Sequence, residues 1–395
     1  MIYFLLLVAP MFLIAPGIFL DRSSVPKMLS IAAGLCFLLR GDLHRKASAQ
    51  NQALAFLGVC LISAIFSVDK WASFYGATKA PYYALFPLVL VALAYLGSTE
   101  LDQEEVDKSL VAGGVLLAGF AICQGITGKT MTGMPWVDGN RAIGFRGSPV
   151  QLAASLTPCF LAAYHRARRD MAFRTVSEDF MAAAIILGGI LAAKAKGAII
   201  ALGAGLWVYE VSGAWRWMGV AFAISLQWGV IQRSEAQKER LEMFKMAWKA
   251  FKQHPFLGWG PDCFLNSVLK NRTKAYDVLV GKNVIPASAH NDLAQVASTL
   301  GLAGLVAYLA GLWKLVRAPY SDNLAMAVLC ALVVQAQVNT IPTDVLVVVA
   351  VILGSRTRDS EGLCVIPSWV APSVMVTGVV LAMKNLSPAV RSWTP

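Results

Sequence analysis

Long hydrophobic runs alternate with short polar segments along most of this 395-residue chain. Runs long enough, or nearly long enough, to cross a bilayer as helices recur about thirteen times. They occupy residues 2–20, 27–39, 51–67, 80–97, 109–126, 148–164, 180–193, 197–211, 215–231, 292–316, 323–339, 342–354 and 364–383. The pattern predicts an all-α, polytopic membrane protein with about 12–13 transmembrane helices.

One long polar stretch interrupts this pattern. It divides the chain into residues 1–231 with about nine predicted spans, a large loop at 232–291, and residues 292–395 with the remaining spans. Within the loop, apolar residues recur at helical spacing at Leu241, Phe244, Trp248 and Phe251. Lysines line another face of the same predicted helix, at Lys238, Lys245, Lys249 and Lys252. An amphipathic basic helix of this kind is typical of a segment that lies on a membrane surface, in contact with membrane lipids.

Composition supports a membrane protein, and the placement of charged residues predicts how its spans are oriented in the membrane. Hydrophobic residues make up 57% of the chain and charged residues only 14%, which is too apolar for a soluble globule of this length. The formal net charge is +11, but many basic residues lie in short connections, so we interpret them as topological signals and expect no nucleic-acid partner. Arg166, Arg168 and Arg169 place one connection in the cytoplasm, and alternation of the spans then places the large loop on the periplasmic side.

The large loop is basic although it is predicted to face outward. It carries ten Lys and Arg residues against five Asp and Glu residues. Long loops cross the membrane largely regardless of charge, so this excess does not overturn the predicted orientation. An anionic ligand is the simplest reason for the excess.

Two residues of the loop are candidates for chemistry. His290 lies where the chain re-enters a hydrophobic run, and a neutral histidine there can accept a proton from a sugar hydroxyl as a general base. The alternative is an interfacial histidine that only caps a helix. Arg240, on the amphipathic helix, can bind a phosphate with two parallel hydrogen bonds and stay charged. Its alternative is a side chain that is solvated or bound to lipid headgroups.

Further cations lie in two other segments that are predicted to face outward. Lys194 and Lys196 stand in a tight turn between two spans, where we expect Lys194 to reach lipid headgroups and Lys196 to contact a ligand. Arg141 and Arg146 belong to a loop at residues 136–149 whose glycines permit close backbone approach. These two arginines either hold an anion or are simply exposed in a turn.

Several kinds of site are absent from the sequence. It contains no H-E-x-x-H, no P-loop and no G-x-G-x-x-G after a strand, and its seven cysteines form no C-x-x-C. No outward pair of aspartates is available to hold Mg²⁺ against a diphosphate. We therefore expect neither a metal nor a cofactor, so that Lys and Arg would have to neutralise a diphosphate substrate.

A combination of motifs suggests a family. The arginine-bearing helix leads to a turn of the pattern P-x-x-G-x-G-P-x-x-F at residues 255–264. His290-Asn291-Asp292-Leu293 follows, and then Gly301 and Gly304. Over about residues 139–309, the chain resembles the superfamily of O-antigen ligases and O-antigen polymerases, which are glycosyltransferases of the bacterial envelope.

The resemblance implies an activity and roles for residues. It implies a membrane enzyme that takes a glycan from a polyprenyl (undecaprenyl) diphosphate carrier at the periplasmic face of the inner membrane. The acceptor would be a lipid A core or another glycan. His290 would activate the acceptor hydroxyl, while Arg240 would grip the diphosphate. Lys196 stands where the family usually has an arginine in an S/T-R-G-type turn, and Arg146 matches an outward R-x-x-G-type loop.

Two more residues of the shared motifs, Asn291 and Asp262, are expected to support this site. The expected reaction is an inverting, metal-independent displacement in which the acceptor hydroxyl attacks the anomeric carbon as the lipid diphosphate leaves. Preplaced cations would stabilise the developing negative charge.

Three alternatives stay open. An O-antigen polymerase would extend a carrier-linked glycan, but a single dominant outward loop favours the ligase. A transporter or flippase of an anionic lipid-linked substrate would need charged residues in the middle of several spans, and these are scarce in the sequence. A non-catalytic lipid-binding scaffold would not depend on His290.

Overall fold

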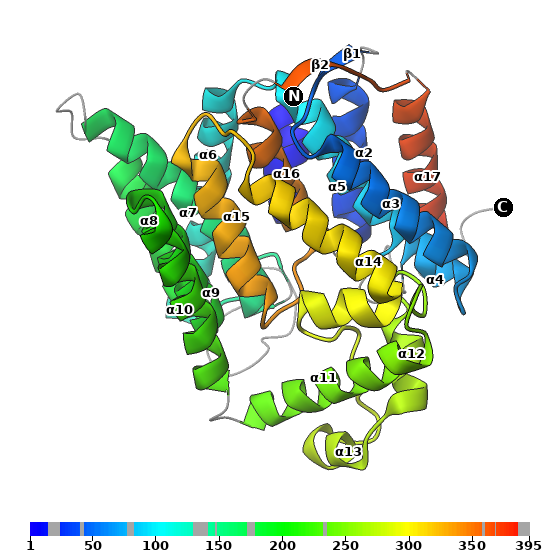
Figure 1. The fold of residues 1–395 in the computed structure, drawn as a ribbon. Helices are drawn as coiled ribbons and strands as arrows, with labels where there is room; N and C mark the ends of the chain where they lie inside the picture. The colour runs from blue at the N-terminus through cyan, green and yellow to red at the C-terminus, as the bar shows by residue number, and fades with distance from the viewer. Residues whose placement is uncertain are drawn as a thin grey trace, which may run out of the picture.

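The computed structural model describes residues 1–14, 24–39, 43–76, 83–128, 141–146, 148–171, 178–231, 235–357, 360–367 and 369–385. Within these ranges the chain is mostly helical (Figure 1). The helices are η1 (Phe4–Val8), α1 (Ala9–Phe12), α2 (Ser24–Leu38), α3 (Gln50–Ile65), α4 (Lys70–Tyr75), α5 (Leu85–Gly97), η2 (Ser98–Glu100), α6 (Gln103–Thr127), α7 (Pro149–Met171), α8 (Glu178–Ala192), α9 (Lys196–Glu210), α10 (Ala214–Ile231), α11 (Glu235–Gln253), α12 (Phe264–Asn271), α13 (Lys274–Val280), α14 (Asp292–Val316), α15 (Asn323–Ala336), α16 (Thr343–Ser355) and α17 (Val370–Lys384).

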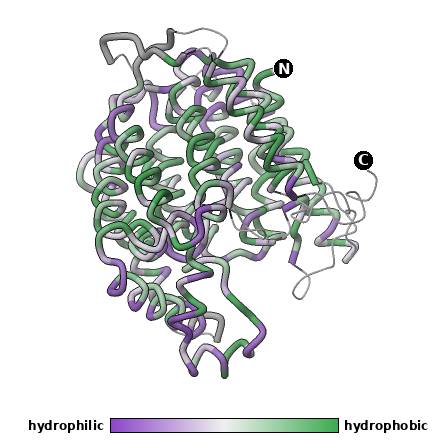
Figure 2. Tube along the Cα trace, turned by 90° about the vertical axis from the view of Figure 1, so that its right-hand side faces the viewer, coloured by the Kyte–Doolittle hydropathy of each residue, from purple (hydrophilic) through white to green (hydrophobic). Residues whose placement is uncertain are grey.

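Most helices form a bundle, and the segment from α11 to α13 folds at one end of it, which we call the loop end (Figure 1). Strands β1 (Leu43–Lys46) and β2 (Ser360–Val365) pair antiparallel at the opposite end. Figure 2 shows hydrophobic residues along the helices of the bundle and more hydrophilic ones toward its ends. A bundle with an apolar middle and polar ends is the arrangement expected of helices that cross a bilayer.

Within the described residues, α6 and α14 are long and apolar enough to cross a membrane, judged by length and composition, although α14 reaches this length only when it is counted across a break at Gly301. Shorter apolar helices include α2, α3, α5, α15, α16 and α17. Each predicted hydrophobic run contains a helix. The end of the first run, residues 15–20, lies outside the described ranges, as do residues 21–23 after it. The helical fold class is confirmed to this extent, and a polytopic arrangement in the membrane is compatible with it.

The two-stranded sheet is an element that the all-α prediction did not include. The strands lie in the connections that follow α2 and precede α17, and these two helices pack side by side. Packing of the helices therefore brings the two connections together, where their backbones can pair. A short edge pairing of this kind leaves no periodic signal in the sequence, because it depends on partners far apart along the chain.

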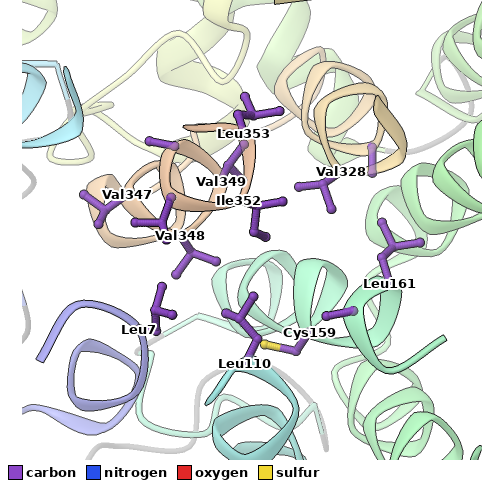
Figure 3. Close-up of a cluster of buried hydrophobic side chains, with 14 of the residues drawn as sticks. Leu7, Leu110, Cys159, Leu161, Val328, Val347, Val348, Val349, Ile352 and Leu353 are labelled. Carbon is purple, nitrogen blue, oxygen red and sulfur yellow. The ribbon is translucent and has the colours of Figure 1, made fainter. Parts of the chain in front are cut away.

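The hydrophobic core lies where η1, α6, α7, α15 and α16 meet. Figure 3 shows side chains of this region converging, among them Leu7, Leu110, Cys159, Val328 and Ile352. Small residues allow the helices to approach closely, as is common in membrane proteins. At Gly189 of α8, for example, an added Cβ would lie 2.7 Å from the Cβ of Ala118 on α6. This close packing gives the loop-end residues a rigid support.

Candidate active site

Helix α11 lies across the loop end of the bundle (Figure 1). Its buried face carries Met243, Met246, Ala247 and Ala250, and the first three of these pack in a small core with α12, α13 and the start of α14. The predicted apolar face is different: Leu241, Phe244 and Trp248 are exposed, and exposed lysines are interleaved with them. The helix therefore has apolar residues on two sides. One side packs against α12, α13 and the start of α14, and the other side is exposed on the surface of the protein.

The glycine-containing turn after α11 holds α14 in a bent shape. Helix α14 is broken at Gly301, whose φ of 65° and ψ of −160° are not helical, and Figure 1 shows it as two segments at an angle. The backbone N–H of Leu302 donates to the carbonyl of Pro255 at 2.7 Å, and the N–H of Ala303 donates to that of Phe256 at 3.2 Å. In return, the N–H of Gly260 donates to the carbonyl of Thr299 at 2.9 Å. The turn thus satisfies backbone groups that the break leaves open.

Glycine is required on both sides of this contact. Gly258 has a φ of 67°, and an added Cβ there would lie 2.2 Å from the backbone carbon of Thr299. At Gly301 an added Cβ would lie 2.4 Å from the backbone carbon of Phe256. The two glycine motifs that carry the family resemblance therefore interlock, and they fix the direction in which the first half of α14, with His290 before it, enters the loop end.

We expect Gly301→Ala to destabilise the fold. An alanine there would combine a left-handed φ with a backbone clash, which costs at least about 2 kcal/mol. The apparent Tm of the purified protein should fall by several degrees in a thermal unfolding experiment. Gly203→Ala on α9 is the control, because its added Cβ meets no atom within 4 Å. Equal Tm values for the two variants would show that the bend does not need glycine.

His290 lies at the start of α14, in a short segment that is tied to the end of α15. Its backbone is left-handed, with φ 51°. The side chain of Asn291 caps α14 by accepting from the N–H of Ala294 at 2.9 Å, and its amide donates to the carbonyl of Gln337 at 2.9 Å. The Nδ1 atom of His290 is buried and has no hydrogen-bond partner among the residues that the structure describes. Asn291 therefore holds the backbone next to His290 in place, and its supporting role in the site stays a prediction.

Next to this segment, a cavity of about 340 Å³ opens at the loop end, and we call it the cationic pocket. Four basic residues from different parts of the chain line it: Arg141, Lys194, Lys196 and Arg240. The other lining residues are Val150, Ala195, Gly197, Ile200, Gln227, Val338 and Asn339, so no lining residue is acidic. The pocket thus has the charge that an anionic ligand needs.

Neighbouring groups hold the cations of the pocket in place. The Nη2 of Arg240 donates to the Oδ1 of Asn339 at 3.2 Å, and the Nε of Arg141 donates to the carbonyl of Ala193 at 3.3 Å. Gln227 donates to the carbonyl of Gly197 at 3.0 Å and so fixes the turn that carries the two lysines. Preformed donors of this kind cost little reorganisation when an anion arrives.

The charges of the site act on one another. Burial lowers the pKa of Arg240; the nearby carboxyl of Glu239 opposes this shift, and the charge of Arg141 adds to it. The pKa of His290 is lowered to about 4 by burial and, secondly, by the positive charge of Arg240. The imidazole is therefore neutral at physiological pH, and the repulsion among the cations would be relieved by a bound anion.

Residues 180–309 match the family model for O-antigen ligase. The resemblance to the O-antigen ligase and polymerase superfamily is thereby confirmed for this segment. No curated protein matches the chain. The matched segment contains the lysine turn, Arg240, both interlocking glycine motifs and His290, whereas Arg141 and Asn339 lie outside it.

Among the residues predicted from the sequence for an O-antigen ligase site, Arg240, Arg141 and Lys196 lie in one pocket. Arg146 does not. It is buried inside the bundle, where it contacts the carboxylate of Asp344 and donates to the carbonyl of Pro10 at 3.1 Å. Lys27 lies 3.6 Å from the same carboxylate. Arg146 is thus paired inside the bundle and does not line the cationic pocket, and we correct its predicted role from diphosphate ligand to structural ion pair.

Asp262 is also placed away from the cationic pocket. It is buried in the glycine turn with φ 55°, and its Oδ1 accepts from the backbone N–H of Tyr83 at 3.4 Å. Asp262 is therefore not a lining residue of the pocket, and its supporting role stays a prediction. The remaining residues of the outward loop before α7, 136–140 and Gly147, lie outside the described ranges.

The sequence interpretation missed three residues of the pocket. Lys194, which was expected to reach headgroups, lines the pocket together with Lys196. Its spacing of two residues from Lys196 in a tight turn was the available signal. Gln227 and Asn339 lie in hydrophobic runs and carried no signal of their own. Within the described ranges, no three His, Cys, Asp or Glu side chains lie close enough to hold a metal ion.

Proposed function

We propose that this protein is a membrane glycosyltransferase of the O-antigen ligase type. It would move a glycan from a polyprenyl diphosphate carrier to an acceptor hydroxyl at the periplasmic face of the inner membrane. The observation that carries this proposal is the convergence of four cationic side chains on one pocket, of which Arg240 is close enough to His290 to lower the pKa of its imidazole. The match to O-antigen ligases supports a transfer of glycans of this general kind.

The cationic pocket suits the diphosphate of the donor. Arg240 and Arg141 can each form paired hydrogen bonds to phosphate oxygens, and Lys194 and Lys196 can act as point charges. As the bond between the anomeric carbon and the phosphate oxygen breaks, the leaving lipid diphosphate gains negative charge. Cations that are already in position stabilise this charge more in the transition state than in the ground state, which lowers the barrier.

His290 suits the role of general base. The acceptor hydroxyl would form the new bond to the anomeric carbon with inversion, and its proton would pass to the neutral imidazole. A base with a pKa of about 4 is weak. The uncompensated charge of Arg240 contributes to this low pKa. A bound diphosphate would offset the charge of Arg240 and raise the pKa of His290. Donor binding would thus strengthen the base that the acceptor needs.

This coupling predicts a specific pH dependence. The acid limb of kcat/KM, which reports the free enzyme, should fall through about pH 4 and not through 6.5, whereas the acid limb of kcat should lie at higher pH. Stability has the matching sign: the unfolded chain binds the proton of His290 more readily, so stability should decrease as pH falls from about 6.5 to 4. Identical limbs for kcat and kcat/KM would contradict the coupling.

A purified-protein assay tests the proposed function. The protein in nanodiscs is given a carrier-linked glycan together with a lipid A core, with and without EDTA. We expect a glycan-sized mass shift on the lipid A core and equal rates with and without the chelator. Longer carrier-linked polymer would assign the protein as a polymerase. Movement of the carrier across the membrane without any transfer would assign it as a flippase, and both results would overturn the ligase proposal.

A further inference from the structure

A second cavity, of about 220 Å³, runs inside the bundle, and we call it the apolar groove. Its walls come from α3, α5, α14, α15 and α16 and are almost entirely apolar, with Phe56, Leu88, Val333 and Leu346 among them. A cavity with such walls has few partners to offer water, so a hydrocarbon chain is its natural occupant.

The groove has a direction. On α14 it extends from Ala307 to Leu315, which corresponds to about 12 Å of helix. Its loop end reaches Asp292, which accepts a hydrogen bond from the hydroxyl of Tyr83. Asp292 is two residues from His290. A lipid seated in the groove would therefore place its polar head at Asp292, two residues along the chain from His290, and its chain toward the opposite end of the bundle.

Helix α15 separates the groove from the cationic pocket. One face of α15 packs on α9, where an added Cβ on Gly205 would lie 3.2 Å from the Cβ of Ala331. Another face, with Leu332 and Val333, lines the groove. Just beyond the helix, Asn339 lines the cationic pocket. Figure 1 shows the same order, with α15 between α9 and α14.

The segment that carries His290 is attached to the helix that separates the two cavities. The hydrogen bond from Asn291 to the carbonyl of Gln337 attaches it to the end of α15. In an inverting displacement, the nucleophile approaches the anomeric carbon from the face opposite to the leaving group. A donor diphosphate on the α9 side of α15 thus requires an acceptor that arrives from the other side, which is the side of α15 on which the groove lies.

We propose that the apolar groove binds a hydrocarbon chain of the acceptor lipid. The proposal rests on the proposed function, because it takes the cationic pocket as the donor diphosphate site. The lipid head would lie at Asp292 and Tyr83, so that an acceptor hydroxyl reaches the imidazole while the chain anchors the molecule between α14 and α15. The donor chain would leave the protein on the other side of α15.

Gly311 offers a clean way to block the groove. It lines the groove, and a Cβ added there would meet no atom within 4 Å, so the ring of Gly311→Phe has open space to enter. Gly203→Phe is the matched control, since Gly203 on α9 also faces open space but does not line the groove. The two variants make the same chemical change in two apolar helices.

The test uses two photoreactive lipids in nanodiscs, each with a diazirine at the end of one chain: a lipid A core and an undecaprenyl diphosphate. We expect the lipid A core to label peptides of α3, α14 and α15, with labelling at least tenfold lower in Gly311→Phe and unchanged in Gly203→Phe. Undecaprenyl diphosphate should label neither α3 nor the second half of α14. In the transfer assay, KM for the acceptor should rise at least tenfold in Gly311→Phe, and KM for the donor should stay the same.

Two outcomes would overturn the proposal: equal labelling of the two variants by the lipid A core, or labelling of the groove by undecaprenyl diphosphate instead. Labelling does not depend on turnover. A parent protein that transfers no glycan would therefore reject the proposed function, while the labelling pattern would still report whether the groove binds a lipid chain and which lipid it binds.

Discussion

Replacing His290 by alanine should reduce glycan transfer by a factor of about 10² to 10⁴, which is the usual contribution of a general base. The charge of Arg240 acts on the imidazole, and Nδ1 of His290 has no hydrogen-bond partner among the described residues, so the substitution removes no hydrogen bond of Nδ1 there. The rate should be measured at saturating donor and acceptor, with elution volume and apparent Tm as checks of the fold.

His254→Ala provides the matched control for this measurement. His254 lies in the same loop and is exposed, and its ring lies 4.7 Å from the ring of Trp259, measured between centroids. This variant should keep the parent rate. If His290→Ala were as active as His254→Ala, His290 would have to be removed from the mechanism.

Arg240→Ala should lower kcat by about 10²-fold, because one well-placed donor to the developing charge contributes about 3 kcal/mol. Arg240→Lys should recover part of the loss, since it restores the charge but not the paired hydrogen bonds. Lys249→Ala, on the exposed side of the same helix, is the control and should be close to the parent.

The Arg240 variant also has an effect that a purely structural role would not produce. Arg240 contributes to the low pKa of His290, so Arg240→Ala should raise that pKa toward its ordinary value. The acid limb of kcat/KM should then move to higher pH. A lower kcat with an unmoved acid limb would show that Arg240 does not act on His290 electrostatically.

Much of the fold follows from the hydrophobic pattern, because each long apolar run is energetically suited to a helix. The break in α14 does not follow from it. The run at residues 292–316 is continuous in hydrophobicity, and only the contact of Gly301 with the turn at Pro255 and Phe256 reveals why the helix bends there. The sequence motif identifies Gly301 as a notable position, but it does not predict that the backbone of the turn at Phe256 packs against it.

The candidate site, too, could be predicted only in part from the sequence. Charge and side-chain chemistry identified Arg141, Lys196 and Arg240 as possible anion ligands, and the fold brings these distant positions to one pocket. The same reasoning predicted Arg146 as a further anion ligand. The ion pair of Arg146 could not be foreseen, because its partner Asp344 lies 198 residues further along the chain, at the start of a hydrophobic run. Which arginine lines the pocket and which forms an ion pair inside the bundle depends on long-range packing, and no local pattern reveals it.

The most direct test is a structure of the protein in nanodiscs with undecaprenyl diphosphate. The account predicts that the two phosphates occupy the cationic pocket, within hydrogen-bond distance of Arg240 and of Lys194 or Lys196, with the imidazole of His290 on the side of the terminal phosphate, which carries the glycan in the donor. Phosphates bound elsewhere, with the cationic pocket empty of the lipid head, would contradict the account.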